Sequence, residues 1–414
     1  MTKNIYCLLI LIFCSISCKT DSEKKIEYLE KTEKINGLAN RYLELNRFSG
    51  IILVTKNSNI IYNESFGLAD YENQKTFSDK TTFKIGKISE LITENIIREM
   101  VNKNKFQLSD SISMYIPEIK AKFTINDLLN HNTNLSGIQQ IQQENPVLKY
   151  STIEFTKLAM QSSDKIENSD LDYNILGLLI ERISGTSFQK NVQNYCTNIG
   201  IYNTYFLKQD TLLAAGYLYN NYRGKDDELH KSPSADSNIT FSSNGIKSNA
   251  HDLIKIINPN NKLDIYGYLE NDGFSYSIQN YPEDKTTIII LSNRRHPVAK
   301  EISTGVYQIL KDKDYRLPLL RQPFEIDKKL LKEYSGTYNM NQNMNFDILN
   351  ENDSLFVILG PNKVHLIPQS SNQFYMKQTD ASIRFLRDST NNLVNEIVLL
   401  NGFLDGEKVK RIKK

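Results

Sequence analysis

The sequence lacks an excess of charge of either sign. It holds 50 lysines and arginines against 48 aspartates and glutamates, so its formal net charge at pH 7 is only +2. Such a balance creates no strong positive field for nucleic-acid phosphates, and we expect no nucleic-acid partner. The 414 residues, 40% hydrophobic and 24% charged, are typical of a soluble globular protein and sufficient for two domains with hydrophobic cores.

Cysteine is almost absent from the body of the chain. Cys7, Cys14 and Cys18 lie within the first 18 residues, and only Cys196 lies beyond them. The body therefore has no second thiol with which to form a structural disulfide. Because Cys196 has no matching histidine and asparagine context, we interpret it as a packed core residue rather than a nucleophile.

Long apolar runs are also missing, apart from one near the start. Residues 5–16 form an almost unbroken apolar run, which has the length of a signal-peptide core and is too short to span a bilayer. The run leads into Ser15-Ile16-Ser17-Cys18, which resembles the lipobox of bacterial lipoproteins. The resemblance implies a signal peptide over residues 1–18, lipidation of Cys18 and a charged tether over residues 19–35. We expect secretion to the bacterial cell envelope and lipid anchoring in the periplasm or outer membrane; a plain secretory signal is the alternative.

Motifs for cofactors and metals are missing as well. The sequence has no glycine-rich phosphate loop and no dinucleotide-binding fingerprint. His230, His251, His296 and His365 share no spacing and have no cysteine or carboxylate partners at metal-ligand intervals. We therefore expect neither a cofactor nor a metal.

Hydrophobic patterning predicts an α+β domain. Apolar runs on both sides of a polar turn at residues 56–59 predict a hairpin, and helical periodicity extends over residues 83–101. Further helices are predicted at residues 127–129, 176–183 and 298–310, and a buried strand at residues 287–291. Strands early and late with helices between them imply an antiparallel sheet flanked by helices.

The pattern changes after residues 313–324, a proline-containing segment that we interpret as a linker. Residues 325–414 consist of short alternating runs separated by turns rich in asparagine, aspartate and glycine. Strands of this kind at regular spacing predict a small all-β barrel domain.

Several motifs, read in order, resemble the class C β-lactamase and penicillin-binding-protein-like serine hydrolase family. They include Phe48-Ser49-Gly50-Ile51-Ile52-Leu53-Val54, Gly67-Leu68-Ala69-Asp70, Thr124-Ile125-Asn126-Asp127-Leu128-Leu129-Asn130-His131 and Leu291-Ser292-Asn293. The resemblance covers residues 36–312 and implies the β-lactamase/transpeptidase-like fold. Tyr334-Ser335-Gly336-Thr337-Tyr338 resembles the β-barrel domain often appended to such proteins.

The chemistry of that family needs three motifs, and each is altered here. A serine should start a helix, with a lysine three residues later to take its proton, but the segment reads Lys87-Ile88-Ser89-Glu90. The Tyr-x-Asn or Ser-x-Asn position holds Asn168-Ser169-Asp170. On the edge strand, the window around Tyr268 has neither the lysine nor the histidine that the family places there.

Two functions remain open. The first is a pseudoenzyme of the envelope that binds or scaffolds a peptide-like or cell-wall fragment without hydrolysing it. The alternative is an active esterase, peptidase or β-lactamase-like hydrolase with a relocated nucleophile such as Ser89 or Ser136.

Two expectations concern the altered site itself. The family resemblance implies that His131 is a packed structural residue. It also implies that the loop with Asp170 overhangs the helix start, where Lys87 and Glu90 share one face. We therefore expect the Lys87 amine to lie within salt-bridge distance, roughly 4 Å, of Glu90 or Asp170.

Overall fold

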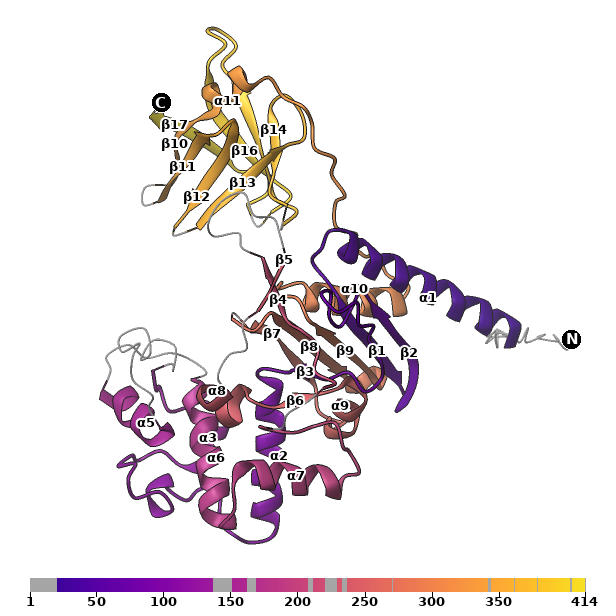
Figure 1. The fold of residues 1–414 in the computed structure, drawn as a ribbon, viewed down its shortest axis with the longest axis vertical. Helices are drawn as coiled ribbons and strands as arrows, with labels where there is room; N and C mark the ends of the chain where they lie inside the picture. The colour runs from indigo at the N-terminus through magenta and orange to yellow at the C-terminus, as the bar shows by residue number, and fades with distance from the viewer. Residues whose placement is uncertain are drawn as a thin grey trace, which may run out of the picture.

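The computed structural model describes residues 21–136, 151–161, 169–207, 211–219, 229–232, 237–269, 271–341, 344–360, 362–377, 379–402 and 404–413. They form an α+β domain followed by a closed β-barrel (Figure 1). The predicted fold class is confirmed. Within the described residues, no helix is long and apolar enough to cross a membrane.

A five-stranded antiparallel sheet forms the centre of the first domain. Its order is β2-β1-β9-β8-β7. The strands are β1 (Gly50–Lys56), β2 (Asn59–Phe66), β7 (Leu263–Leu269), β8 (Phe274–Tyr281) and β9 (Thr286–Ser292). The first two form the predicted hairpin. The early and late parts of the domain meet where β1 pairs with β9, with Gly50 opposite Ser292.

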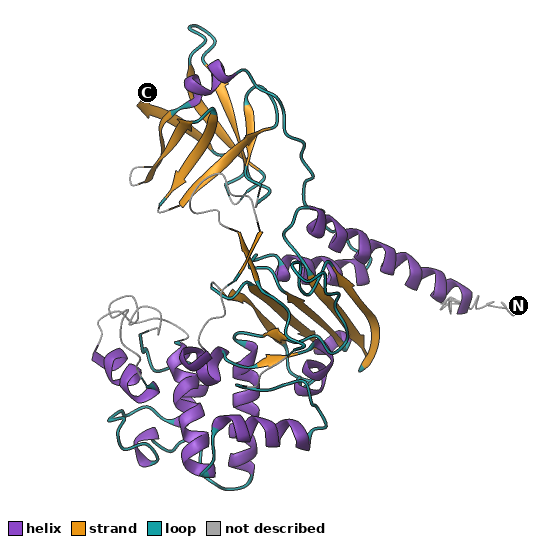
Figure 2. Cartoon of the chain, viewed as in Figure 1, coloured by secondary structure: helices purple, strands orange, loops and turns teal. Residues whose placement is uncertain are grey.

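Helices cover both faces of this sheet (Figure 2). On β1, Ile51 and Leu53 belong to one buried cluster, whereas Ile52 and Val54 belong to the other. Residues of β9 alternate in the same way. Because successive strand side chains point to opposite faces, a strand covered on both sides reads as a continuous apolar run.

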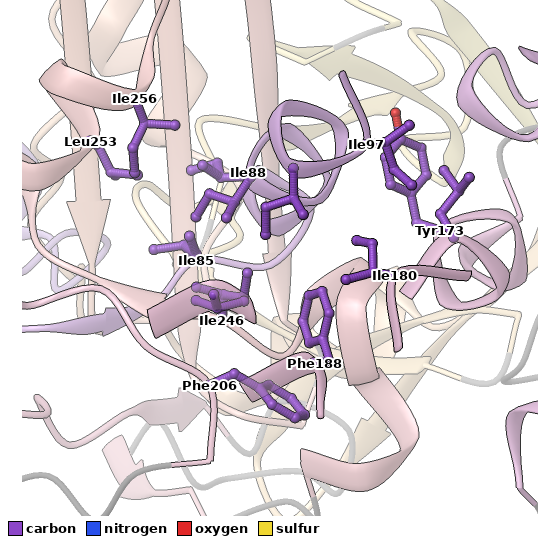
Figure 3. Close-up of a cluster of buried hydrophobic side chains, with 14 of the residues drawn as sticks. Ile85, Ile88, Ile97, Tyr173, Ile180, Phe188, Phe206, Ile246, Leu253 and Ile256 are labelled. Atoms are coloured by element: carbon purple, nitrogen blue, oxygen red, sulfur yellow. The ribbon is translucent and has the colours of Figure 1, made fainter. Parts of the chain in front are cut away.

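The two faces carry different helices. The helices α1 (Asp21–Glu44) and α10 (Ala299–Leu310) cover one of them. The other faces the larger cluster, part of which Figure 3 shows, with Ile88 and Ile97 of α2 near Ile180 and Phe188. The described α-helices on that side are α2 (Ile88–Asn102), α3 (Ile125–Leu129), α5 (Thr152–Gln161), α6 (Asp170–Ser184), α7 (Phe188–Asn198), α8 (Ser237–Asn244) and α9 (Ala250–Ile256), and a short 3-10 helix, η1 (Ile112–Met114), joins them.

The helix predicted over residues 83–101 begins later than its periodicity suggested. The pair β3 (Phe83–Lys84) and β6 (Lys247–Ser248) forms a small sheet, and α2 starts only at Ile88. Gly86 between them has a φ of 51°, a left-handed conformation that interrupts a helical path. A second small sheet joins β4 (Tyr217–Tyr219) to β5 (Leu229–Lys231).

The C-terminal domain is an eight-stranded closed barrel. Its strands are β10 (Gly336–Asn341), β11 (Met344–Glu351), β12 (Ser354–Leu359), β13 (Asn362–Pro368), β14 (Gln373–Tyr375), β15 (Ser382–Arg387), β16 (Val394–Leu400) and β17 (Lys408–Lys413). Pairing of β10 with β17 closes it and removes the free edges of the sheet. The short helix α11 (Lys328–Tyr334) places the Tyr334 ring on Phe385, with centroids 4.2 Å apart.

Arg47 joins the two domains. It lies just before β1 and is 4% exposed. Its guanidinium forms an ion pair with Asp380 at 2.9 Å and donates hydrogen bonds to the carbonyl oxygens of Lys377 and Thr379, in the turn between β14 and β15. A buried cation with several partners restrains the barrel more firmly than exposed pairs would.

Two glycine substitutions, one at the β1–β9 contact and one in α1, should change the unfolding free energy in opposite directions. In Gly50→Ala, the new Cβ would lie 2.0 Å from the Leu291 carbonyl oxygen, so the strands must move apart. We expect a loss of about 1–3 kcal/mol in unfolding free energy. Gly37→Ala in α1, where no atom lies within 4 Å of the added Cβ, should gain roughly 0.5–1 kcal/mol through helix propensity. Urea unfolding measures both; equal stabilities of the two variants would contradict the proposed packing.

Candidate functional site

The candidate site lies at the start of α2, where the family places its nucleophile. Lys87 occupies the N-cap position and makes no side-chain capping bond. Its backbone N–H donates a hydrogen bond to the Tyr276 hydroxyl at 3.0 Å. Lysine is a poor N-cap because its charge opposes the positive end of the helix dipole, whereas Glu90 in the first turn matches it.

The Tyr276 side chain fits against two glycines. A Cβ on Gly86 would lie 2.4 Å from its ring, and one on Gly267 would lie 2.8 Å from its hydroxyl. Tyr276 is only 3% exposed, and burial raises its pKa to about 12, so the phenol is neutral at physiological pH. The Tyr276 phenol therefore accepts the hydrogen bond of the backbone N–H of residue 87 itself.

Three carboxyl groups interact with Lys87 and His131 at the start of α2. Glu90 belongs to α2, and Asp170 and Asp172 belong to the first turn of α6. Burial raises the pKa of both Glu90 and Asp170, and the charge of Lys87 opposes that increase in each case. The charge of Lys87 thus lowers the pKa of both predicted partners, Glu90 and Asp170. That the Lys87 amine lies within ion-pair distance of either one stays a prediction.

His131 bridges two of the carboxylates. Its Nδ1 lies 2.9 Å from Asp172 Oδ2, and its Nε2 lies 3.5 Å from Glu90 Oε2. Burial acts to lower the pKa of His131, but the hydrogen bonds to Asp172 and Glu90 outweigh it and raise the pKa to about 9. Thr133 donates a further hydrogen bond to Asp172. His131 is therefore a packed residue, as predicted, and its imidazole is charged at neutral pH.

The Glu90 carboxyl is only partly compensated by its neighbours in this cluster. Glu90 Oε1 is buried and has no hydrogen-bond partner among the described residues. Because a buried, unpaired carboxylate oxygen is costly, the raised pKa of Glu90 indicates that this carboxyl binds a proton more readily than an exposed glutamate.

The two alternative nucleophiles lie inside the core. Ser89 is 0% exposed, and its Oγ accepts a hydrogen bond from the Ile246 N–H at 3.1 Å. Ser136 is also 0% exposed, and its carbonyl oxygen accepts a hydrogen bond from the Ser169 hydroxyl at 2.9 Å. The lone thiol of Cys196 is 2% exposed, and burial raises its pKa to about 12, so it is a packed core residue as predicted.

The structure does not bring Tyr268 to the cluster. Tyr268 and Tyr266 are about half exposed, and the Lys300 amine of α10 lies 3.6 Å from the Tyr266 ring centre. The added Cβ of Gly267 points instead to Tyr276. Since strand side chains alternate, Tyr268 lies on the α10 face, and β7 presents Gly267 to the site. Asn168 lies outside the described residues.

Sequence reasoning missed two residues of this site. Asp172 stands two positions after Asp170, and an acid close to a predicted helix start was the only available signal. Tyr276 lies 189 residues from Lys87 in the sequence, and only the position of β8 in the sheet brings it to the start of α2.

The chain belongs to the beta-lactamase family. The family profile described as Beta-lactamase matches residues 30–272. Together with the fold, this match defines a protein of the β-lactamase and penicillin-binding-protein-like serine hydrolase class.

Particular relatives share parts of the chain. The putative penicillin-binding protein PbpX of Bacillus subtilis is 26% identical over 205 residues, which cover 47% of this chain and 51% of that protein. A teichoic acid D-alanine hydrolase of Staphylococcus aureus is 24% identical over 210 residues, covering 48% and 52%. The chain therefore spans about half the length of the curated relatives it matches.

A solved structure resembles the chain over more of its length. The octameric penicillin-binding protein homologue from Pyrococcus abyssi has a TM-score of 0.57 at 16% identity and covers 91% of this chain and 99% of its own. At this identity, the likeness concerns the fold alone.

The raised pKa of His131 predicts a pH-dependent stability. The folded value of about 9 lies above the usual value of 6.5, so protonation favours the folded state. This contribution is fully present below about pH 6.5 and is lost as the pH rises through 9. His131→Gln should therefore cost most stability at pH 6 and much less at pH 10 in urea unfolding.

The matched control is His230→Gln, which changes an exposed histidine on β5. It should leave the pH profile unchanged. A stability loss for His131→Gln that is equal at both pH values would contradict a charged imidazole in the cluster.

Proposed function

We propose that this protein is a non-hydrolytic member of its family, which binds or scaffolds a peptide-like or cell-wall fragment in the cell envelope. The hydrogen bond from the Lys87 N–H to the Tyr276 hydroxyl carries the proposal. Position 87 therefore carries two changes. Its side chain lacks the nucleophilic hydroxyl, and its own backbone N–H is already bonded to Tyr276.

Acyl transfer by a serine enzyme needs a hydroxyl, a base that takes its proton, and donors for the oxyanion that forms. At position 87 an amine replaces the hydroxyl, and at position 90 a carboxyl replaces the family's lysine. An acyl group transferred to the lysine amine would form an amide, which is too stable to turn over. A backbone N–H that is bonded to Tyr276 must also give up that bond before it can stabilise an oxyanion.

The burial of Ser89 and Ser136 weighs against a relocated nucleophile. Each would have to leave the core before it could reach a substrate, and Ser89 would in addition leave the Ile246 N–H without its acceptor. Loss of such a buried hydrogen bond costs about 1–3 kcal/mol. We therefore favour binding over hydrolysis.

The relatives support the choice of ligand class. One is described as a putative penicillin-binding protein and the other as a teichoic acid D-alanine hydrolase. Both names refer to the bacterial cell wall or to drugs that act on it. Soluble muropeptides are the appropriate probe, and isothermal titration calorimetry should detect their binding without any change in the muropeptide by mass spectrometry. Cleavage, or no binding at millimolar concentration, would contradict the proposal.

We expect no covalent labelling by a fluorescent penicillin or a fluorophosphonate. The double variant Lys87→Ser/Glu90→Lys should also remain unlabelled, because Asp170 and Tyr276 still occupy the site. Gel fluorescence and intact-mass measurement test both proteins. Labelling of the unmodified protein that disappears in Ser89→Ala, but not in a variant of an exposed serine such as Ser65→Ala, would establish the hydrolase alternative.

We also propose that Cys18 is lipidated, since the short apolar run ends in Ser15-Ile16-Ser17-Cys18. Several acyl chains on one cysteine give stable membrane anchoring, whereas a single chain gives only marginal binding. Mass spectrometry of the mature N-terminus should find a diacylated or triacylated Cys18. Cys18→Ser should move the protein from the membrane to the soluble fraction, while Cys14→Ser should not. An unmodified N-terminus that begins at another residue would contradict lipidation.

A further inference from the structure

A half-open groove lies beneath α1, on the face of the sheet opposite the start of α2. It encloses about 280 Å³. The groove is bounded by α1, the β1–β2 hairpin, the start of β9 and the end of α10. The helices α1 and α10 lie side by side (Figure 1). None of its lining residues belongs to the candidate site. An occupant here would therefore be independent of the proposed function.

The walls of the groove are apolar and preformed. Ile35 and Tyr62 at its base are 1% and 4% exposed. The Tyr28 hydroxyl donates a hydrogen bond to the Ile61 carbonyl oxygen at 2.6 Å, which holds the tyrosine ring across one side. On the other side, Tyr307 stacks on Tyr281 with ring centres 3.7 Å apart. Such walls offer an apolar ligand a surface that needs little reorganisation.

Most of the charged side chains that line the groove are lysines. Three lysines and one glutamate line it. Lys31 is engaged by Glu27 at 2.8 Å and Asp312 at 2.9 Å, and Lys311 is engaged by Asp284 at 2.6 Å.

Lys56 differs from the other two lysines. Its amine donates a hydrogen bond to the Thr286 hydroxyl at 3.2 Å, and among the described residues no carboxylate lies within 4.0 Å of it. Lys56 and Thr286 are opposite each other in the β1–β9 register, so the strands fix both groups at one end of the groove. This end therefore presents a positioned cation that can pair with an anionic ligand.

We propose that the groove binds a free single-chain amphiphile with a carboxylate head, such as a medium-chain fatty acid. The carboxylate pairs with the Lys56 amine, which the Thr286 hydroxyl holds in place as an acceptor, and the hydrocarbon chain lies against Ile35, Ile61 and Leu310. A peptide fits less well, because the apolar walls offer few partners for its backbone N–H and C=O groups. The volume is at the lower limit of small-molecule sites, which suits one chain.

Sodium decanoate, kept below its micelle concentration, is the probe. Isothermal titration calorimetry on the full chain should show saturable binding. Lys56→Ala should weaken it about tenfold or more, since a charge-assisted contact is lost. Thr32→Trp should abolish binding by filling the groove. Lys122→Ala, which removes an exposed lysine far from the groove, should bind decanoate as the unmodified protein does.

The head group is tested on the unmodified protein, so the result does not depend on variants that fold. Decanoate should bind more tightly than decanol, and decyltrimethylammonium should not bind. Three results would overturn the proposal: no saturable decanoate binding, equal affinity of Lys56→Ala and Lys122→Ala in correctly folded protein, or binding of phosphatidylglycerol vesicles without binding of free decanoate. Muropeptide binding in the same variants reports separately on the proposed function.

Discussion

The pairing of β1 with β9 is the contact on which the rest of the first domain depends. It joins segments more than 200 residues apart and is buried on both faces, with Ile52 turned to one cluster and Leu53 to the other. Two apolar faces require two layers of helices, because an uncovered face would leave isoleucine and leucine side chains in water. The layer of α1 and α10 and the larger layer that begins with α2 both follow from that requirement.

This pairing also decides what the start of α2 can do. Since β8 lies beside β9, its Tyr276 side chain reaches the Lys87 N–H, and the glycines at positions 86 and 267 leave room for the phenol. The altered residues make physical sense as a set. A lysine or carboxyl buried alone would be costly, whereas Lys87, Glu90, His131, Asp170 and Asp172 compensate one another in part. Such a cluster does not imply added stability; it explains how charges persist at this depth.

The two faces of the sheet separate two kinds of chemistry. On one face, charged groups compensate one another in part, and the Tyr276 phenol accepts a hydrogen bond at the start of α2. On the other face, the groove beneath α1 combines apolar walls with Lys56, whose amine has no carboxylate within 4.0 Å among the described residues. A ligand in the groove and a ligand at the candidate site would be separated by the sheet, so each can be tested without removing the other.

Much of the architecture follows from local pattern alone. Alternation predicts the β1–β2 hairpin and the barrel strands, and the apolar run at residues 287–291 predicts β9, because strand and helix periods are properties of neighbouring residues. Lys87, Glu90 and Asp170 could also be located from the sequence, because they stand at fixed intervals from recognisable motifs. The start of α2 was predicted too early because periodicity does not detect the left-handed conformation of Gly86. Only tertiary structure decides that Tyr276 meets Lys87, that His131 lies between Glu90 and Asp172, and that Tyr268 faces α10. Those contacts depend on strand register and helix placement between distant segments, where a shift of one residue turns a side chain to the other face of the sheet.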